Sequence, residues 1–362
     1  MDQDAIPLAY HVIAGIIDIN GVVCNLFTLI FISFTRLGSR TATILFRTQC
    51  IFDGLTCLFA AISLFSPVHM DNFSGWFASF LCHFWLSEYF LKFMELLNVS
   101  NLMWIAIDRF SAVYLGSRYK AFQKYEPFLC YTLILFHAII SPLPVIFAVD
   151  YSNKVCEEAR LVYNTAFDQF IVYSWLILAY LIPSIVMIAC YSRVYYFIKQ
   201  SLVNSQPQKH STCSVDVTKS DLNQSRTVGQ QVSSATLSAS VSTSALEPTS
   251  FSSIRRMKSI LLSITLMCTL FVLSHSYYHI YSLASLYGAV QYQSISIQRR
   301  LSIFFTVIKS SLNPIILVVS SQHLRKNIVK LYYKLSYRIK YSRNSHPPPN
   351  ITESSTKTSD DY

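Results

Sequence analysis

The stretch Ile105–Phe110, IAIDRF, ends a long apolar run with an acid, an arginine and an aromatic residue. An arginine is costly in lipid, so at such a place it must face a helix-bundle interior, a water-filled cleft or a partner. Taken alone, the tripeptide is better explained as an incidental charge pair at a solvated helix end. Its meaning therefore depends on the other marks along the chain.

The composition of the 362-residue chain points to a membrane rather than to a soluble core. Hydrophobic residues make up 52% of it and charged residues only 13%, about half the charged fraction of soluble domains. We therefore expect an integral membrane protein, whose net charge of +10 reports orientation across the membrane. No basic and aromatic patch stands apart from the membrane-flanking segments, so nucleic-acid binding is not expected.

The nine cysteines give no support for a metal site. Most of them lie inside apolar runs, where they act as small packing residues. None forms a CxxC pair or a Cys/His cluster with metal-ligand spacing. No nucleophile–base pairing or HExxH-type site is present either, which argues against an enzyme.

Apolar runs long enough to span a membrane, which takes about 20 residues, occur seven times. They lie near residues 10–34, 44–68, 80–110, 128–149, 168–198, 255–284 and 296–319. We therefore predict an all-α bundle of seven transmembrane helices, divided into residues 10–199 and 255–320 and preceded by a short N-terminal segment, 1–9. The first run lacks a convincing signal-peptide cleavage site and is expected to remain as a spanning helix.

Basic residues predict the orientation of the bundle, since cytoplasmic connections are enriched in Lys and Arg. They gather in alternate connections, at Arg36, Arg40 and Arg47, at Arg118, Lys120 and Lys124, and at Arg193, Lys199, Arg255, Arg256 and Lys258. The connection at 69–79 has none, while Arg299 and Arg300 before the seventh span are an exception. We therefore expect a multi-pass protein of the plasma membrane with its N-terminus outside the cell.

Three segments outside the spans differ in character. Residues 200–254 are rich in Ser and Thr and predict a disordered cytoplasmic loop, and residues 341–362 predict a disordered tail. Before this tail, Leu324 and Ile328 begin an apolar stripe at helical spacing among Lys and Arg residues. This pattern predicts a short amphipathic eighth helix over 321–340 that lies on membrane lipid.

With seven spans and the N-terminus outside, the chain resembles the rhodopsin-like (class A) family of G-protein-coupled receptors over roughly residues 10–340. No single motif is specific, but each family mark falls in its proper helix. These marks are Asn25, Asp53, Asp108-Arg109-Phe110, Pro183 with Tyr191, Phe271, and Asn313-Pro314. The resemblance implies an outer disulfide between Cys82 and Cys156. It also implies that G-protein coupling and activation use Asp108, Arg109, Tyr191, Phe271, Asn313 and Pro314.

Departures from the family pattern concern the parts that move during activation. Leu317 replaces the last tyrosine of Asn-Pro-x-x-Tyr, and His275 and Tyr277 stand where the family has Trp and Pro in helix 6. The interval from Cys82 to Arg109 is two residues longer than usual. We therefore expect a divergent member whose activation mechanism is modified.

The inner end of helix 6 carries Arg255 and Arg256 and no acid, so a salt bridge from it to Arg109 is not available. Asp108 can still hold Arg109 by a charge-assisted contact. The resting state is thus expected to be weakly stabilised, and basal activity to be raised.

Lys309 is the most unusual residue, because a lysine at mid-membrane needs a partner. In one interpretation its ammonium pairs with Asp53 and takes the place of the sodium ion that family members bind there. The polar neighbours expected around this pair are Asn25, Asn98, His275, Ser310 and Asn313. In the other interpretation Lys309 extends into the ligand cavity.

An opsin-like photoreceptor is an alternative raised by the same lysine. Opsins hold retinal on a lysine six residues before the Asn-Pro asparagine, but here that position is Val307, and Lys309 is four before. A seven-helix transporter or channel is the other alternative, and it is expected to show repeats and broken helices, which the sequence lacks. We therefore expect no cofactor and favour a signalling receptor.

Helix 3 carries three charges, Glu88, Lys92 and Glu95, whose spacings of four and three put them on one face. They form either an internally neutralised ladder or part of a pocket for a charged ligand. Amine receptors place an aspartate at the position of Leu91, which argues against a monoamine. The acidic and aromatic residues expected at the outer surface favour a peptide instead. Our candidate ligand-binding residues are Glu88, Lys92, Glu95, His275 and Tyr278.

Two further signals concern modification and partners. Asn72 begins an N-glycosylation sequon on a predicted outer loop. The Ser/Thr-rich stretch 352–359 in the tail predicts phosphorylation on activation and recruitment of an arrestin. The expected partners are thus an extracellular ligand, a heterotrimeric G protein, an arrestin and membrane lipid.

Overall fold

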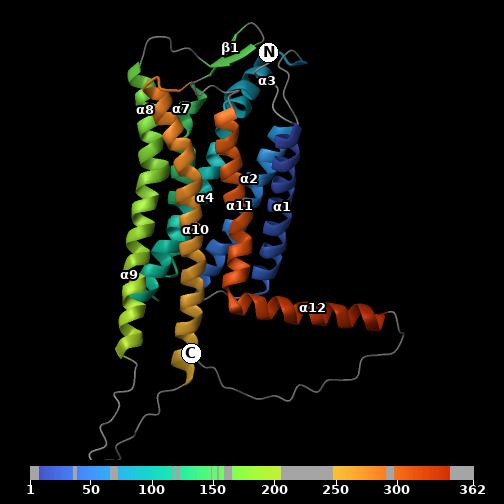
Figure 1. Cartoon of the computed structure of the whole chain (residues 1–362), viewed down its shortest axis with the longest axis vertical. Coiled ribbons are helices and arrows are strands. Elements are labelled where there is room, and N and C mark those ends of the chain that lie inside the picture. Colours follow the sequence, from blue (N-terminus) through green and yellow to red (C-terminus); the bar gives the residue numbers. More distant parts are fainter. Residues whose placement is uncertain are drawn as a thin grey trace, which may run out of the picture.

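Seven helices that are long and apolar enough to cross a membrane stand side by side in one bundle (Figure 1). The structure is a computed structural model of the chain, and it describes residues 8–35, 39–65, 72–115, 118–119, 123–147, 149–152, 155–158, 165–204, 248–290 and 297–342. The predicted all-α, seven-helix membrane architecture is confirmed.

The bundle is centred on the third span. In chain order the spanning elements are α1 (Leu8–Ser33), α2 (Arg40–Phe65), α4 (Tyr89–Tyr114), α6 (Glu126–Ile140) with α7 (Leu143–Ile146), α8 (Thr165–Trp175) continuing into α9 (Ile182–Asn204), α10 (Pro248–Leu286) and α11 (Ile297–Ser320). Helix α4 packs against α2, α6, α9 and α10, while α1 packs against α2 and α11. Polar side chains on α4 therefore meet those of most other helices.

Close approach of α1 to its neighbours depends on Gly21. A Cβ atom at this position would lie 2.4 Å from both Cys57 Sγ on α2 and Ser311 Oγ on α11. Small residues let transmembrane helices pack backbone against backbone, which is how helices associate where lipid surrounds them. The glycine thus fixes α1 against the rest of the bundle.

The third span is interrupted near its beginning, where the sequence predicted one helix over 80–110. Helix α3 (Gly75–Phe80) and the π-helical turn η2 (Leu81–Leu86) precede a break, and α4 starts only at Tyr89. Glu88 lies at the break with φ of 64°, and it is the one non-glycine residue with positive φ in the described ranges. A π-helical turn contains more residues than an α-helical turn, so η2 and the break accommodate the long interval between Cys82 and Arg109.

The fifth span contains a second π-helical turn, η3 (Leu176–Leu181), directly before Pro183. Proline has no backbone N–H, so it removes one helical hydrogen bond and favours such a bulge. The fifth span thus contains a local bulge just before this proline.

Helices α9 and α10 extend beyond the ends that the sequence predicted. The loop expected over 200–254 is shorter at both ends, because α9 continues to Asn204 and α10 begins at Pro248. Proline is favoured in the first turn of a helix, where its missing N–H has no partner to lose. The rest of the predicted loop, 205–247, lies outside the described residues, as does most of the predicted tail.

Helix α12 (Gln322–Ser342) follows α11, lies crosswise to it and extends sideways beyond α1 (Figure 1). It lies where the eighth helix was predicted and extends two residues beyond residue 340. Leu324 is fully buried and belongs to the bundle core. Contact of α12 with a membrane surface stays a prediction.

A two-stranded antiparallel hairpin lies over the opposite end of the bundle. Its strands are β1 (Val149–Ser152) and β2 (Val155–Glu158), and Cys156 on β2 forms a disulfide with Cys82 on η2. The predicted disulfide is therefore present. We call this end of the bundle the disulfide end, and the end that contains Asp108 and Arg109 the arginine end.

Candidate functional site

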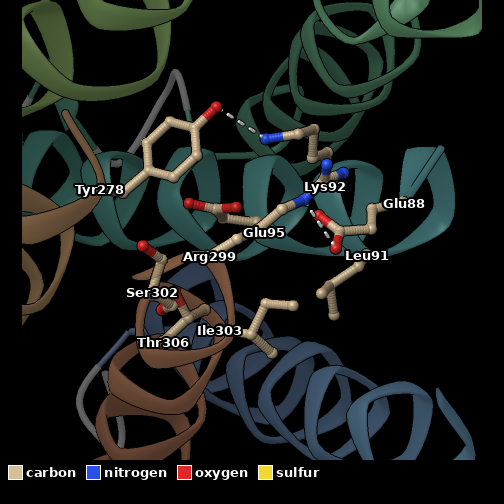
Figure 2. Close-up of a pocket in the computed structure, with 9 residues that line it drawn as sticks. All are labelled: Glu88, Leu91, Lys92, Glu95, Tyr278, Arg299, Ser302, Ile303 and Thr306. Carbon is tan, nitrogen blue, oxygen red and sulfur yellow. Dashed lines mark hydrogen bonds and ion pairs between the residues drawn. The ribbon is translucent and has the colours of Figure 1, made fainter. Parts of the chain in front are cut away.

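A small pocket lies between α4, α10 and α11 near the disulfide end (Figure 2). Charged and polar side chains dominate its lining, which consists of Glu88, Leu91, Lys92, Glu95, Tyr278, Arg299, Ser302, Ile303 and Thr306. Its volume of ≈ 20 Å³ has room for about one water molecule. Four of the five predicted ligand-binding residues line this one pocket, and the fifth, His275, contacts Glu95 beside it.

Glu88 and Arg299 form an ion pair across the pocket, with Arg299 Nε 3.0 Å from Glu88 Oε1. Both side chains are largely buried, at 22% and 16% exposed. This contact explains why Arg299 was an exception to the pattern of basic connections, because its charge pairs inside the bundle. It also holds Glu88 in a left-handed conformation that costs about 1–2 kcal/mol for a residue with a Cβ.

Lys92 extends between two aromatic rings. Its Nζ donates a hydrogen bond to the Tyr278 hydroxyl at 3.0 Å, and it lies 4.6 Å from the Trp175 ring centre and 4.4 Å from that of Tyr278. Such cation–π contacts stabilise a buried ammonium. In the described part of the chain no carboxylate lies within ion-pair distance of Lys92.

Glu95 contacts the sixth span, with its Oε1 2.9 Å from Nε2 of His275 on α10. His275 is 1% exposed, and its ring centre lies 4.5 Å from that of Phe271. His275 was expected among the polar neighbours of Lys309, and in the structure its partner is Glu95 on α4. Glu88 and Glu95 each pair with a basic residue of another helix, Arg299 on α11 and His275 on α10. Of the two interpretations of these charges, this pairing favours the pocket over an internally neutralised ladder.

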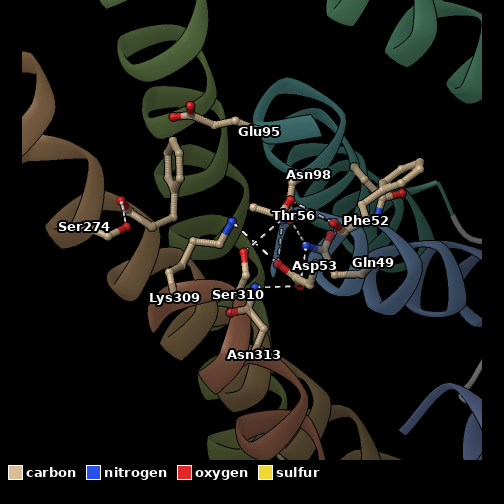
Figure 3. Close-up of polar contacts among 12 residues, drawn as sticks. Gln49, Phe52, Asp53, Thr56, Glu95, Asn98, Ser274, Lys309, Ser310 and Asn313 are labelled. Atoms are coloured by element: carbon tan, nitrogen blue, oxygen red, sulfur yellow. Dashed lines mark hydrogen bonds and ion pairs between the residues drawn. The ribbon is translucent and has the colours of Figure 1, made fainter. Parts of the chain in front are cut away.

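A second polar cluster lies in the middle of the bundle, around Asp53 on α2 (Figure 3). Three side-chain amides donate hydrogen bonds to its carboxylate: Asn98 at 2.6 Å, Gln49 at 3.0 Å and Asn313 at 2.9 Å. Lys309 Nζ lies 3.8 Å from Asp53 Oδ1, and both side chains are 1% exposed. The structure therefore contains the Lys309–Asp53 pair, at a distance longer than a hydrogen bond.

The same cluster joins α1 and α4 to α11. Asn25 donates to the backbone oxygen of Ser310 at 3.0 Å, and Asn98 donates to the Ser310 hydroxyl at 3.3 Å. Lys309 does not line the pocket of Figure 2, which disfavours its extension into that cavity. Val307, at the position that an opsin lysine would take, is buried against α2 in an apolar cluster.

At the arginine end, Arg109 is held by its own neighbour. Its Nε donates to Asp108 Oδ2 at 2.7 Å, and one terminal nitrogen donates to the Ser39 hydroxyl at 2.9 Å. The Tyr119 hydroxyl donates to the other oxygen of Asp108 at 2.5 Å. Burial, and then the nearby Asp108 carboxylate, raise the pKa of Tyr119, so this phenol stays protonated and remains a donor at neutral pH.

The profile of the 7 transmembrane receptor (rhodopsin family) matches residues 24–317, which is most of the chain. The chain belongs to the rhodopsin family of seven-transmembrane receptors. None of the curated proteins matches the receptor. Family membership makes it a multi-pass membrane receptor rather than an enzyme.

Inside this receptor, the family marks predicted for activation lie where apolar packing is tight. Phe271 is fully buried, Tyr191 is 8% exposed and Leu317 is 2% exposed in one core cluster. Asn313 bonds Asp53, and Pro314 lies inside α11. Their roles in coupling remain predictions, as does glycosylation of Asn72, an exposed residue just before α3.

Several contributing residues of the receptor were not predicted. Folding alone brings four of them into contact with predicted residues, and nothing in the local sequence indicated these contacts: Arg299, Gln49, Ser39 and Tyr119. Asp18 is different, because an acid inside the first apolar run is itself a signal. It is buried at 3% exposed on α1.

Proposed function

We propose that an extracellular ligand binds at the pocket of Figure 2 by displacing its side chains, since the pocket itself has room for about one water molecule. The receptor then transmits that binding to a heterotrimeric G protein at the arginine end. The observation that carries this proposal is the state of Arg109. It is 14% exposed and held by Asp108 and Ser39, so it is available for exchange of partners at an end of the bundle. The N-terminus is then extracellular, as the distribution of Lys and Arg indicates.

One continuous helix supports communication between the two ends. Helix α10 contributes Tyr278 to the pocket and His275 to the contact with Glu95, and it continues past the arginine end. A ligand that displaces Glu95 or Tyr278 changes how α10 sits against α4. Because α10 has no proline after Pro248, displacement at His275 moves the helix as one piece.

The pocket favours a peptide over a monoamine. Leu91 lines it at the position where amine receptors place an aspartate, and both carboxylates already have basic partners, Arg299 and His275. Lys92 instead contacts the Tyr278 hydroxyl and the aromatic rings of Trp175 and Tyr278. The ligand group that gains most there is an anion, such as the C-terminal carboxylate of a peptide.

The test is a screen of peptides, each supplied as the free acid and as the C-terminal amide, with nucleotide exchange on several G proteins as the readout. We expect responses to free acids that amidation removes. Arg109→Ala should abolish the response while surface expression stays normal. The matched control is Arg47→Ala, since Arg47 lies at the same end and contacts backbone carbonyls of Ile32 and Ser33.

Basal activity gives a second test that needs no ligand. Nucleotide exchange above the empty-vector level is expected in the absence of peptide. Tyr119→Phe should raise it further, because the variant removes a hydrogen bond to the acid that holds Arg109. A basal signal equal to that of the vector, in both proteins, would contradict a weakly held resting state.

A further inference from the structure

A large apolar groove lies on the outer side of α10 and α11, at the arginine end and next to the start of α12. Its volume is ≈ 550 Å³, within the range of about 300–1,000 Å³ typical of sites for small molecules. Leu262 and Leu266 on α10 and Ile315 and Val319 on α11 line it, and they are 54%, 42%, 44% and 61% exposed. Because these residues belong to membrane-spanning helices, the groove opens toward lipid.

The mouth of the groove is polar and positively charged. Gln322 and Arg325, in the first turn of α12, complete the lining, and Arg325 is its one charged residue. The two serines of the lining already have partners, because Ser259 donates to the backbone oxygen of Ser320, and the Ser320 hydroxyl bonds the oxygen of Ile316. Arg325 therefore provides the main polar contact that an occupant can gain.

Charge around the groove has a single sign. No Asp or Glu occurs between Pro248 and Ile351, so α10, α11 and α12 contain cations and no acid. The cations nearest to Arg325 in the sequence of α12 are Lys326 and Lys330. Basic residues at a membrane surface attract anionic lipids, and an apolar groove beneath them suits an acyl chain.

We propose that this groove binds one anionic glycerophospholipid, with an acyl chain against Leu262, Ile315 and Val319 and its phosphate at Arg325. The occupant is amphiphilic because the lining changes from apolar to cationic along the groove. The groove also spans the contact in which Ser259 meets Ser320, so a bound lipid stabilises the close arrangement of α10 and α11.

Fluorescence quenching by brominated lipids tests the proposal. Leu262→Trp places an indole in the groove, and Leu273→Trp, on the same helix and 65% exposed but outside the groove, is the matched control. Each variant is placed in nanodiscs of phosphatidylcholine with 20% brominated phosphatidylglycerol, or with 20% brominated phosphatidylcholine instead. The unsubstituted receptor contains four native tryptophans, so its spectrum in the same nanodiscs is subtracted from that of each variant.

We expect brominated phosphatidylglycerol to be enriched about fivefold over brominated phosphatidylcholine at the Leu262→Trp indole, as one basic residue near an anionic headgroup implies. Little preference is expected at the control position. Adding Arg325→Gln should remove the preference. Lys330→Gln removes the same charge outside the groove lining, so it should keep most of the preference. Added inorganic phosphate should not compete, since the acyl chain contributes to binding.

Three outcomes would overturn the proposal. These are equal quenching by the two lipids, a preference that survives Arg325→Gln, and no quenching by either lipid, which indicates that protein covers the groove. If the tryptophan variant fails to fold, native mass spectrometry of the wild type and of Arg325→Gln replaces it. Phosphatidylglycerol should then remain bound to the wild type and be lost from Arg325→Gln.

Discussion

The pocket and the middle of the bundle both contain buried charges, and different contacts stabilise them. In the pocket, Glu88 and Glu95 each have their own basic partner, and these carboxylate side chains are 22% and 12% exposed. In the middle of the bundle, Asp53 is 1% exposed, is bonded by three amides and lies 3.8 Å from Lys309. The comparison indicates that a ligand can exchange partners in the pocket, whereas the mid-bundle cluster fixes the positions of the helices.

The largest effect is expected from Lys309→Met, which leaves Asp53 buried without its cation. Removing one partner of a buried ion pair typically costs about 3–5 kcal/mol, so the variant should lose much of its thermal stability in nanodiscs. The double variant Asp53→Asn/Lys309→Met should recover most of the loss, because neither charge then remains. Additive losses in the double variant would show that the two residues do not interact.

Sodium should stabilise Lys309→Asn and leave the wild type unchanged, if the ammonium takes the place of the ion. At a sodium concentration 100 times its Kd the gain is about 2.7 kcal/mol. The measurement is the unfolding temperature in sodium chloride compared with choline chloride at equal ionic strength. Sodium dependence already present in the wild type would rule out this replacement.

The same substitution in the pocket, Lys92→Met, should destabilise the receptor less than Lys309→Met does. Methionine keeps the apolar contacts with Trp175 and Tyr278, and the cation–π contribution that it loses is about 0.5–2 kcal/mol. Responses to free-acid peptides should nevertheless fall at least tenfold. Equal losses of stability in Lys92→Met and Lys309→Met would show that the pocket and the mid-bundle cluster contribute equally to stability.

The smallest expected effect concerns the backbone at Glu88. Glu88→Gly and Glu88→Ala both remove the ion pair with Arg299, but only glycine adopts a φ of 64° without strain. The glycine variant should therefore be more stable than the alanine variant by about 1 kcal/mol. The opposite order, which ordinary helix propensity predicts, would show that Glu88 does not have this conformation.

Hydropathy was sufficient to predict the seven spans, because lipid requires about 20 consecutive apolar residues in each. It could not give the helix ends, and α2 begins at Arg40 rather than near residue 44. The interruption at Glu88 was also missed. A left-handed conformation depends on tertiary contacts, and a glutamate does not indicate it.

For the polar residues, too, the sequence predicted some contacts and missed others. Asp53, Asn98, Ser310 and Asn313 were predicted to gather and do so. From its place in the sequence, Arg299 was counted among the basic residues of the connections between spans. In the structure it pairs with Glu88, which lies 211 residues earlier. Contacts of this kind depend on how helices are rotated about their axes, and periodicity alone does not give that rotation relative to a particular partner.

The uninterrupted course of α10 has a mechanical consequence. From His275 to Pro248 the helix measures about 40 Å at a rise of about 1.5 Å per residue. As a rigid rod pivoting near His275, it would convert a tilt of about 5° into a displacement of about 3–4 Å at its far tip. A change of the size of one side-chain contact near His275 thus becomes a movement at the arginine end that is large enough for another protein to sense.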